Sequence, residues 1–255
     1  MIGIIGSGNM GKAIASRMDS GVLVSDAVSA KLKFSGKPRV KAVKDNIELA
    51  KRSNIIILAV KPRDIKKVLL EIKPYAEKKL IISIAAGIKT IFIEKLLKNT
   101  RVVRVMPNMP ALAGKGISAI ARGKSASKKD VGAAVRIFLK IGETVLVKED
   151  HMDVITALSG SGPAYYFLFT DMLAAAGSAA GLPKALAKKL AVATFIGAAE
   201  SAAVAGISMR DFVKKVVSKG GTTEAALKVF KKKSLGRIVE QAVRSATKRS
   251  KELSN

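Results

Sequence analysis

Hydrophobic positions in the first half of the chain form short runs that alternate with segments of helical spacing. The apolar runs lie at residues 2–6, 22–25, 55–60, 80–84, 102–105, 117–121 and 144–147. Between them, the spacing predicts helices over residues 9–19, 45–52, 64–71, 90–98 and 127–140. Because strands alternate with helices, we expect an α/β domain built on a doubly wound parallel sheet with crossover helices.

The pattern changes near Glu149, after which the chain is rich in Ala, Leu and Lys at helical spacing and has no strand-like run. Gly181-Leu182-Pro183 indicates the end of one helix and the start of the next. Ser208, with Asp211 three residues later, predicts a capped helix start. We therefore expect a nucleotide-binding domain over residues 1–149 and an all-helical domain over residues 150–255.

A glycine motif follows the first apolar run and opens the first helix, as a dinucleotide-binding turn requires. Its first glycine permits the tight turn, its second lets a pyrophosphate approach the backbone, and its third lets helix and strand pack closely. The amides at the helix N-terminus then bind phosphate. The alternative is a turn with a purely structural role. The predicted cofactor-binding residues here are Gly6, Ser7, Gly8, Asn9, Met10 and Gly11.

The choice between NADH and NADPH is open in the sequence. Asp26 follows the second strand, where a carboxylate binds the adenosine ribose hydroxyls and disfavours a 2′-phosphate. Ser25 could instead donate to such a phosphate, and Lys31 and Lys33 are close in sequence. An aspartate in a solvent-facing turn is the alternative. We predict that both Ser25 and Asp26 contact the cofactor.

Residues beyond other strand ends complete the predicted cofactor site, since ligands of open parallel sheets bind beyond the carboxyl ends of strands. The segment Ala59-Val60-Lys61-Pro62 lies at such an end, although Lys61 could also be an ordinary surface lysine. Ala85-Ala86-Gly87 follows the next strand, where small residues leave space for a flat nicotinamide ring. Asn108, between two prolines after a further strand, is a predicted cofactor contact as well.

The amino-acid composition indicates which kinds of ligand and partner the protein can bind. The net charge of +27 comes from 46 Lys and Arg against 19 Asp and Glu, and such a surface attracts anions. The basic residues are spread along the chain, aromatics make up only 4%, and Trp is absent, so we expect no specific nucleic-acid partner. The absence of cysteine excludes thiolate metal sites and cysteine nucleophiles, and we predict no metal site.

The most apolar stretch, Ala164 to Leu182, is interrupted by Asp171 and Gly177 and has about the minimum length for crossing a bilayer. We interpret it as a helix buried at a subunit interface, not as a membrane span. No secretory signal pattern opens the sequence, so a cytoplasmic protein is expected.

Two segments of the second half are more specific than the glycine turn: Ser159-Gly160-Ser161-Gly162-Pro163-Ala164-Tyr165 and Ser218-Lys219-Gly220-Gly221-Thr222-Thr223. The second offers hydroxyls and two glycines ahead of a helix N-terminus, which suits a carboxylate, although capping by Thr222 or Thr223 is an alternative. With the motifs above, in this order, the sequence resembles the pyrroline-5-carboxylate reductases over essentially its whole length.

The resemblance implies a Rossmann-like domain followed by a helical dimerisation domain, and a homodimer that assembles further into a ring such as a decamer. It implies hydride transfer from NADPH or NADH to the cyclic imine of 1-pyrroline-5-carboxylate, giving L-proline. Carried over by position, Asn46 and Lys61 would lie along the cofactor. The residues that would hold the substrate carboxylate are Ser218, Gly220, Gly221, Thr222 and Thr223.

Departures from the family pattern are Ala27, where an arginine is frequent, and Lys219, where a proline is frequent. Because a protonated imine is already electrophilic, catalysis would rest mainly on aligning the two reacting carbons. Thr156 is a candidate proton donor through water, and Lys61 a second candidate catalytic group. His151, the only histidine, lies in a charged run and is interpreted as solvated. A 3-hydroxy-acid dehydrogenase would need a lysine early in the helix after Pro163, which is missing.

Overall fold

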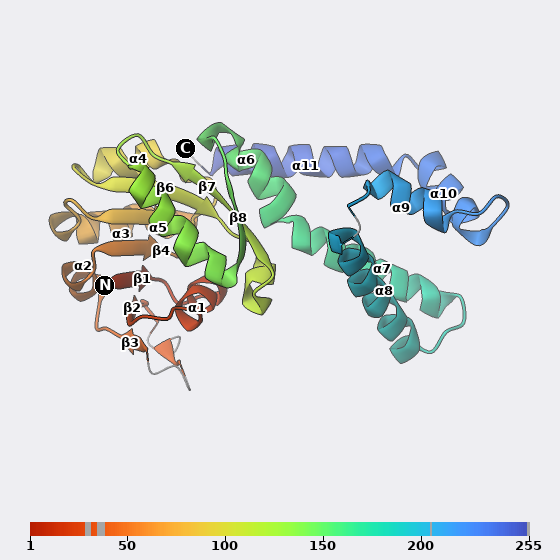
Figure 1. Cartoon of the computed structure of the whole chain (residues 1–255), viewed down its shortest axis with the longest axis horizontal. Helices are drawn as coiled ribbons and strands as arrows, with labels where there is room; N and C mark the ends of the chain where they lie inside the picture. Colours follow the sequence, from red (N-terminus) through yellow and green to blue (C-terminus); the bar gives the residue numbers. More distant parts are fainter. Residues whose placement is uncertain (29–31, 35–38, 205, 254–255) are drawn as a thin grey trace. The chain divides into compact units, whose positions relative to one another are not determined.

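The computed structural model describes residues 1–28, 32–34, 39–204 and 206–253. The chain divides into two compact units (Figure 1). The first comprises Met1–Ser161 together with Arg244–Asn255, and the second comprises Gly162–Val243. The first unit therefore extends beyond residue 149, where the sequence pattern changes, and it includes the end of the last helix.

The first unit is built on an eight-stranded sheet with the strand order β3-β2-β1-β4-β5-β6-β7-β8. The strands are β1 (Ile2–Ile5), β2 (Val22–Ser25), β3 (Val40–Ala42), β4 (Ile55–Leu58), β5 (Leu80–Ser83), β6 (Arg101–Met106), β7 (Gly116–Arg122) and β8 (Gly142–Leu146). Each apolar run of the sequence pattern is a strand. The short edge strand β3 was not predicted, because it has only three residues and Lys41 at its centre.

The sheet is parallel except at one pair, where β6 and β7 run antiparallel. The expected doubly wound parallel sheet is confirmed, with this one antiparallel pair as an exception. Its physical reason is the connection: only the short 3-10 helix Met109–Ala113 separates the two strands, and a parallel pair needs a longer crossover.

Helices cover both faces of this sheet (Figure 1). They are α1 (Asn9–Ser16), α2 (Asn46–Arg52), α3 (Ile65–Ile72), α4 (Thr90–Leu96) and α5 (Lys128–Phe138). Alternate residues of a strand point to opposite faces, so Ile5 and Ile56 belong to the core cluster with α2 and α3. Ile4 and Ile57 belong to the other, with α1 and α5. Burial on both sides explains the unbroken apolar runs.

The rest of the chain is helical, as the sequence predicts, and the described residues after β8 contain no strand. The helices are α6 (Met152–Ile155), α7 (Gly162–Ala179), α8 (Lys184–Val204), α9 (Met209–Val216), α10 (Thr222–Lys232) and α11 (Leu235–Glu252). In the second unit Tyr166 of α7 stacks on Phe195 of α8, with ring centroids 5.7 Å apart. Among the helices that the structure describes, none is both long and apolar enough to span a membrane.

Candidate cofactor and substrate sites

The three glycines of the turn between β1 and α1 have different surroundings. Gly6 has a φ of 102°, a conformation that favours glycine, and its amide donates to the Ser25 carbonyl at 2.8 Å. A Cβ on Gly11 would lie 2.0 Å from the carbonyl oxygen of Gly6, whereas a Cβ on Gly8 would meet no described atom within 4 Å. The bare face of Gly8 is thus open to a ligand.

Helix α1 begins directly after this turn, with Gly8 as its N-cap and no side chain capping it among the described residues. The first amides of a helix lack partners within the helix, and together with the helix dipole they favour an anion. The open face of Gly8 and the uncapped start of α1 fit a pyrophosphate.

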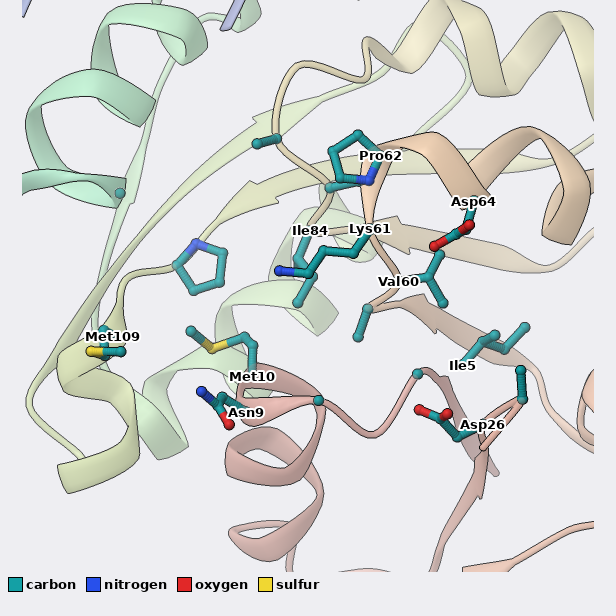
Figure 2. Close-up of a pocket in the computed structure, with 18 of the residues that line it drawn as sticks. Ile5, Asn9, Met10, Asp26, Val60, Lys61, Pro62, Asp64, Ile84 and Met109 are labelled. Atoms are coloured by element: carbon teal, nitrogen blue, oxygen red, sulfur yellow. The ribbon is translucent and has the colours of Figure 1, made fainter. Parts of the chain in front are cut away.

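A cavity of about 610 Å³ lies over this turn at the carboxyl ends of the central strands (Figure 2). Its volume is within the usual range for a small-molecule or cofactor site. Figure 2 shows Asn9 and Asp26 on the side formed by β2 and α1, with Lys61 and Pro62 opposite. The predicted cofactor residues that line it are Gly6, Gly8, Asn9, Met10, Asp26, Asn46, Ala59, Val60, Lys61, Pro62, Ala85, Ala86 and Asn108.

Four predicted cofactor residues do not line the cavity: Ser7, Gly11, Ser25 and Gly87. Sequence reasoning missed other lining residues, namely Ile5, Ala27, Val28, Asp64, Ile84, Pro107, Met109, Leu112 and Gly160. Most of these neighbour predicted residues in sequence. Gly160 is far in sequence from the predicted cofactor residues, although it belongs to the segment Ser159–Tyr165, and its place in the wall depends on how the chain after β8 returns to the sheet.

Asp26 and Ser25 have separate roles at the end of β2. The Asp26 carboxylate accepts hydrogen bonds from the Ser7 amide at 2.7 Å and from the Val28 amide at 2.9 Å. The Ser25 hydroxyl is buried and donates to the Asn46 side-chain oxygen at 2.7 Å. Asp26 therefore faces the cavity, while Ser25 supports Asn46 from behind. Lys31, the other candidate for a 2′-phosphate, lies outside the described residues, and Lys33 is exposed.

Lys61 lies three residues beyond the end of β4, at the opposite wall, and precedes the 3-10 helix Pro62–Asp64. Its side chain is exposed and extends across the cavity on the side of Ile84 (Figure 2). Asn108 is held in place by the Ile117 amide, which donates to its side-chain oxygen at 2.9 Å. Both residues can therefore present polar groups to a ligand in the cavity.

Thr156 opens the π-helical segment Thr156–Gly160. Its hydroxyl is buried and donates to the Met152 carbonyl at 2.7 Å, and the residue does not line the cavity. The oxygen can still accept a hydrogen bond from water. Its role as a proton donor stays a prediction. His151 is exposed, as expected.

The predicted substrate loop, residues 218–223, lies in the second unit. The N-cap of α10 is Gly221, and no described side chain caps this helix, so Thr222 and Thr223 are not its cap. Gly220 has a φ of 74°, and its amide donates to Glu224 at 2.6 Å. The exposed amides at this helix start can bind a carboxylate.

The loop is stabilised from within. A Cβ on Gly221 would lie 2.3 Å from the Ser218 hydroxyl oxygen, so a larger residue there would require the Ser218 side chain to move. The pKa of Glu224 is lowered, first by the hydrogen bond from the Gly220 amide and then by Lys228, whose ammonium lies 3.0 Å away. Glu224 is thus an anion that holds the loop.

The open glycine turn, the uncapped start of α1 and the cavity at the strand ends define the class of protein: a nicotinamide-dinucleotide-dependent oxidoreductase with a Rossmann-like domain. Within the described residues, no group of His, Asp and Glu side chains could hold a metal ion. Residues 149–253 match the model for pyrroline-5-carboxylate reductase dimerisation, and residues 1–87 match that for NADP oxidoreductase, coenzyme F420-dependent.

The pyrroline-5-carboxylate reductase of Synechocystis is 38% identical over 99% of this chain and 97% of its own length. The solved pyrroline-5-carboxylate reductase of Coxiella burnetii is 37% identical, covers 100% of this chain and 98% of its own, and has a TM-score of 0.91. The NADP-bound pyrroline carboxylate reductase of Plasmodium falciparum is 32% identical over 100% and 98% of the two chains, with a TM-score of 0.90. The chain belongs to the pyrroline-5-carboxylate reductase family.

Proposed function

We propose that this protein reduces the C=N bond of 1-pyrroline-5-carboxylate to give L-proline, with NADH or NADPH as the reductant. The observation that carries the proposal is 38% sequence identity, over nearly the full length of both chains, with a reductase of this name. Two uncapped helix starts support it. One, at α1, fits the pyrophosphate of the cofactor, and the other, at α10, fits the carboxylate of the substrate.

The residues of the cavity fit an extended dinucleotide. Asp26 would hold the adenosine ribose, and the amides after Gly8 would hold the pyrophosphate. Ala85 and Ala86 would leave room for the nicotinamide ring, with Lys61 and Asn108 supplying polar contacts. When bound, the reduced nicotinamide supplies the hydride.

The substrate would be oriented by the loop 218–223. Ser218, Thr222 and Thr223 offer hydroxyls, and the amides of the first turn of α10 offer donors for a carboxylate. The Gly220 amide donates to Glu224 and the Gly221 amide to the Ser218 carbonyl, so these two glycines would shape the loop around the substrate. Hydride adds to the imine carbon, and the nitrogen of the protonated imine becomes the secondary amine. The work of the protein is therefore alignment of two carbon atoms, which by itself contributes a large rate enhancement.

The preference between NADH and NADPH depends on Asp26. Its carboxylate faces the cavity. The hydroxyl of Ser25, which could donate a hydrogen bond to a 2′-phosphate, instead donates to the Asn46 side chain. An anionic side chain repels a 2′-phosphate and accepts hydrogen bonds from ribose hydroxyls. We therefore propose a preference for NADH, with NADPH as a weaker alternative.

The helical half supports self-association, in line with its match to the dimerisation model. Within the second unit as described, Tyr166, Phe167 and Leu168 of α7 are 61%, 51% and 61% exposed. Consecutive exposed apolar side chains of this kind mark an interface. We propose that α7 is buried in a homodimer, that dimers assemble into a larger ring such as a decamer, and that the protein works in the cytoplasm.

A direct test is to incubate the purified protein with 1-pyrroline-5-carboxylate and either NADH or NADPH, and to follow the loss of reduced-nicotinamide absorbance with formation of proline. Loss with at least one cofactor is expected. If neither is consumed, the proposed reaction is wrong. Light scattering tests the assembly: the chain mass is 26.9 kDa, and a particle of that mass would contradict the dimer.

A further inference from the structure

A buried group of charged side chains lies in the first unit, outside the cavity wall. At its centre Arg104 of β6 is 2% exposed. One guanidinium nitrogen is 3.6 Å from a Glu149 carboxylate oxygen, and the other is 3.6 Å from a carboxylate oxygen of Asp153. A buried guanidinium requires compensating charge, which these two acids provide.

The carboxylates of Glu149 and Asp153 also accept hydrogen bonds from two different helices. Glu149 accepts from the amide of Thr90 at 2.7 Å and from its hydroxyl at 2.6 Å. Asp153 accepts from the Ser250 hydroxyl at 2.7 Å. Thr90 is the first residue of α4, and Ser250 lies near the end of α11. Arg104 therefore joins the start of α4 to the end of the last helix.

A second contact closes this arrangement. Gly87 has a φ of 80°, and a Cβ placed on it would lie 2.6 Å from the Leu253 Cβ and 2.9 Å from the Ser250 carbonyl oxygen. The end of α11 therefore packs directly on the bare face of Gly87. The loop of residues 84–89 is held at Gly87 by this packing and, just beyond its end, at Thr90 by Glu149.

The same loop forms part of the cavity. Ile84, Ala85 and Ala86 line it, whereas Arg104, Glu149, Asp153 and Ser250 do not. The hydrogen bonds and packing described above connect the charged group to this loop at Gly87 and, just beyond it, at Thr90. The charged group can therefore act on a bound ligand through the position of the loop.

We propose that Arg104 is a positioning residue, which clamps the loop 84–89 between α4 and the end of α11 and so fixes the wall against which the nicotinamide lies. The placement of the nicotinamide rests on the proposed function. The clamp predicts that loosening it misaligns hydride transfer, while the phosphate-binding turn, which is remote from it in sequence, keeps its affinity for the cofactor.

Ser250→Ala is the sharpest test, because it removes one hydroxyl from the clamp and leaves the charges in place. Ser245→Ala, at an exposed position of the same helix, is the matched control. Ser250→Thr keeps a hydroxyl and should restore the clamp. Asp153→Asn and Arg104→Lys are second variants, since Arg104→Met would leave two acids without their cation and could prevent folding.

The first measurement is amide hydrogen exchange over residues 84–90, which needs no activity. We expect about tenfold faster exchange in Ser250→Ala than in the unmodified protein, with Ser245→Ala and Ser250→Thr unchanged. Unchanged exchange in both Ser250→Ala and Asp153→Asn would overturn the clamp. Hydrogen exchange tests the clamp even if the protein does not reduce the imine, a result that would refute the proposed reaction alone.

The second measurement compares kcat with the Kd of NADH. We expect kcat of Ser250→Ala to fall roughly tenfold, with the Kd of NADH within twofold and kcat recovered in Ser250→Thr. An unchanged kcat despite faster exchange would overturn the positioning role. So would a parallel loss of kcat and cofactor affinity, because that result marks a general structural defect.

Discussion

The carboxylate of Asp26 accepts hydrogen bonds from both the backbone amide and the hydroxyl of Ser7, at 2.7 and 3.1 Å. Because Ser7 lies inside the glycine turn, this contact ties the end of β2 to the phosphate-binding segment. The amide of Val28 donates to the other carboxylate oxygen. The Asp26 carboxylate is thus held in one orientation at the cavity by hydrogen bonds within the protein.

Replacing Asp26 by Ala should shift the preference from NADH toward NADPH. Loss of the carboxylate removes repulsion of the 2′-phosphate and a partner of the ribose hydroxyls, so we expect the ratio of kcat/KM for the two cofactors to change about tenfold, or roughly 1.4 kcal/mol. Steady-state kinetics with each cofactor checks this. Asp64→Ala, which removes another carboxylate at the cavity, is the control. An unchanged ratio in Asp26→Ala would assign Asp26 a purely structural role.

Two glycine substitutions in the same turn should affect different properties, one the stability of the fold and the other the affinity for the cofactor. Gly11→Ala places a Cβ 2.0 Å from the Gly6 carbonyl oxygen and should lower the free energy of unfolding by about 1–3 kcal/mol. Gly8→Ala meets no described atom within 4 Å and should leave Tm nearly unchanged while weakening NADH binding by about tenfold or more. Thermal unfolding and cofactor titration of both variants separate these effects. Equal loss of Tm in the two would contradict this division of roles.

Local patterns predicted the parts of the fold that depend on neighbouring residues. The glycine turn, the apolar strands and the cap of α9 by Ser208 were all readable, because each is determined within a few residues. The antiparallel β7 was not predicted, because the expectation of a parallel sheet came from the strand–helix alternation of the whole first half and passed over the short connection between β6 and β7. Long-range contacts were also hidden: the return of Ser250 to Asp153 spans 97 residues and leaves no periodic pattern.

The candidate site shows the same limit. Thirteen predicted cofactor residues line the cavity because strand ends meet at one edge of a parallel sheet. Gly87 was predicted as a cofactor contact from its position after β5. Its bare face instead accommodates Leu253, a residue that no local rule would place there.

Glu224→Ala should raise the KM for the imine roughly fivefold and leave the Kd of NADH unchanged. The side chain accepts the Gly220 amide and so holds the loop at its positive φ, and its loss frees that amide. Glu200→Ala, at an exposed position of α8, should change neither constant. An unaltered KM in Glu224→Ala would mean that the loop needs no internal support.

Glu224 supports the substrate loop in a pH-dependent way, because the pKa of Glu224 is lowered, first by the hydrogen bond from the Gly220 amide and then by Lys228. Since the folded pKa lies below the unfolded value, the contribution is fully present above the unfolded pKa, roughly 4.3, and is lost as the pH falls through the folded pKa. Glu224 therefore stays ionised between about pH 5.5 and 8. The ratio of the KM values of Glu224→Ala and the unmodified protein should be constant over that range, and a ratio that varies would contradict the assignment.

Thr156→Val tests the proton donor. The hydroxyl already donates to the Met152 carbonyl, so it can act only by accepting a hydrogen bond from a water molecule, and that water delivers the proton to the imine nitrogen. A protonated imine needs no donor. We therefore expect kcat/KM of Thr156→Val to equal that of the unmodified protein at acidic pH and to fall, by about threefold or more, where the imine is unprotonated. Thr156→Ser, which keeps the hydroxyl, should follow the unmodified protein throughout, and identical pH profiles for all three would remove Thr156 from the mechanism.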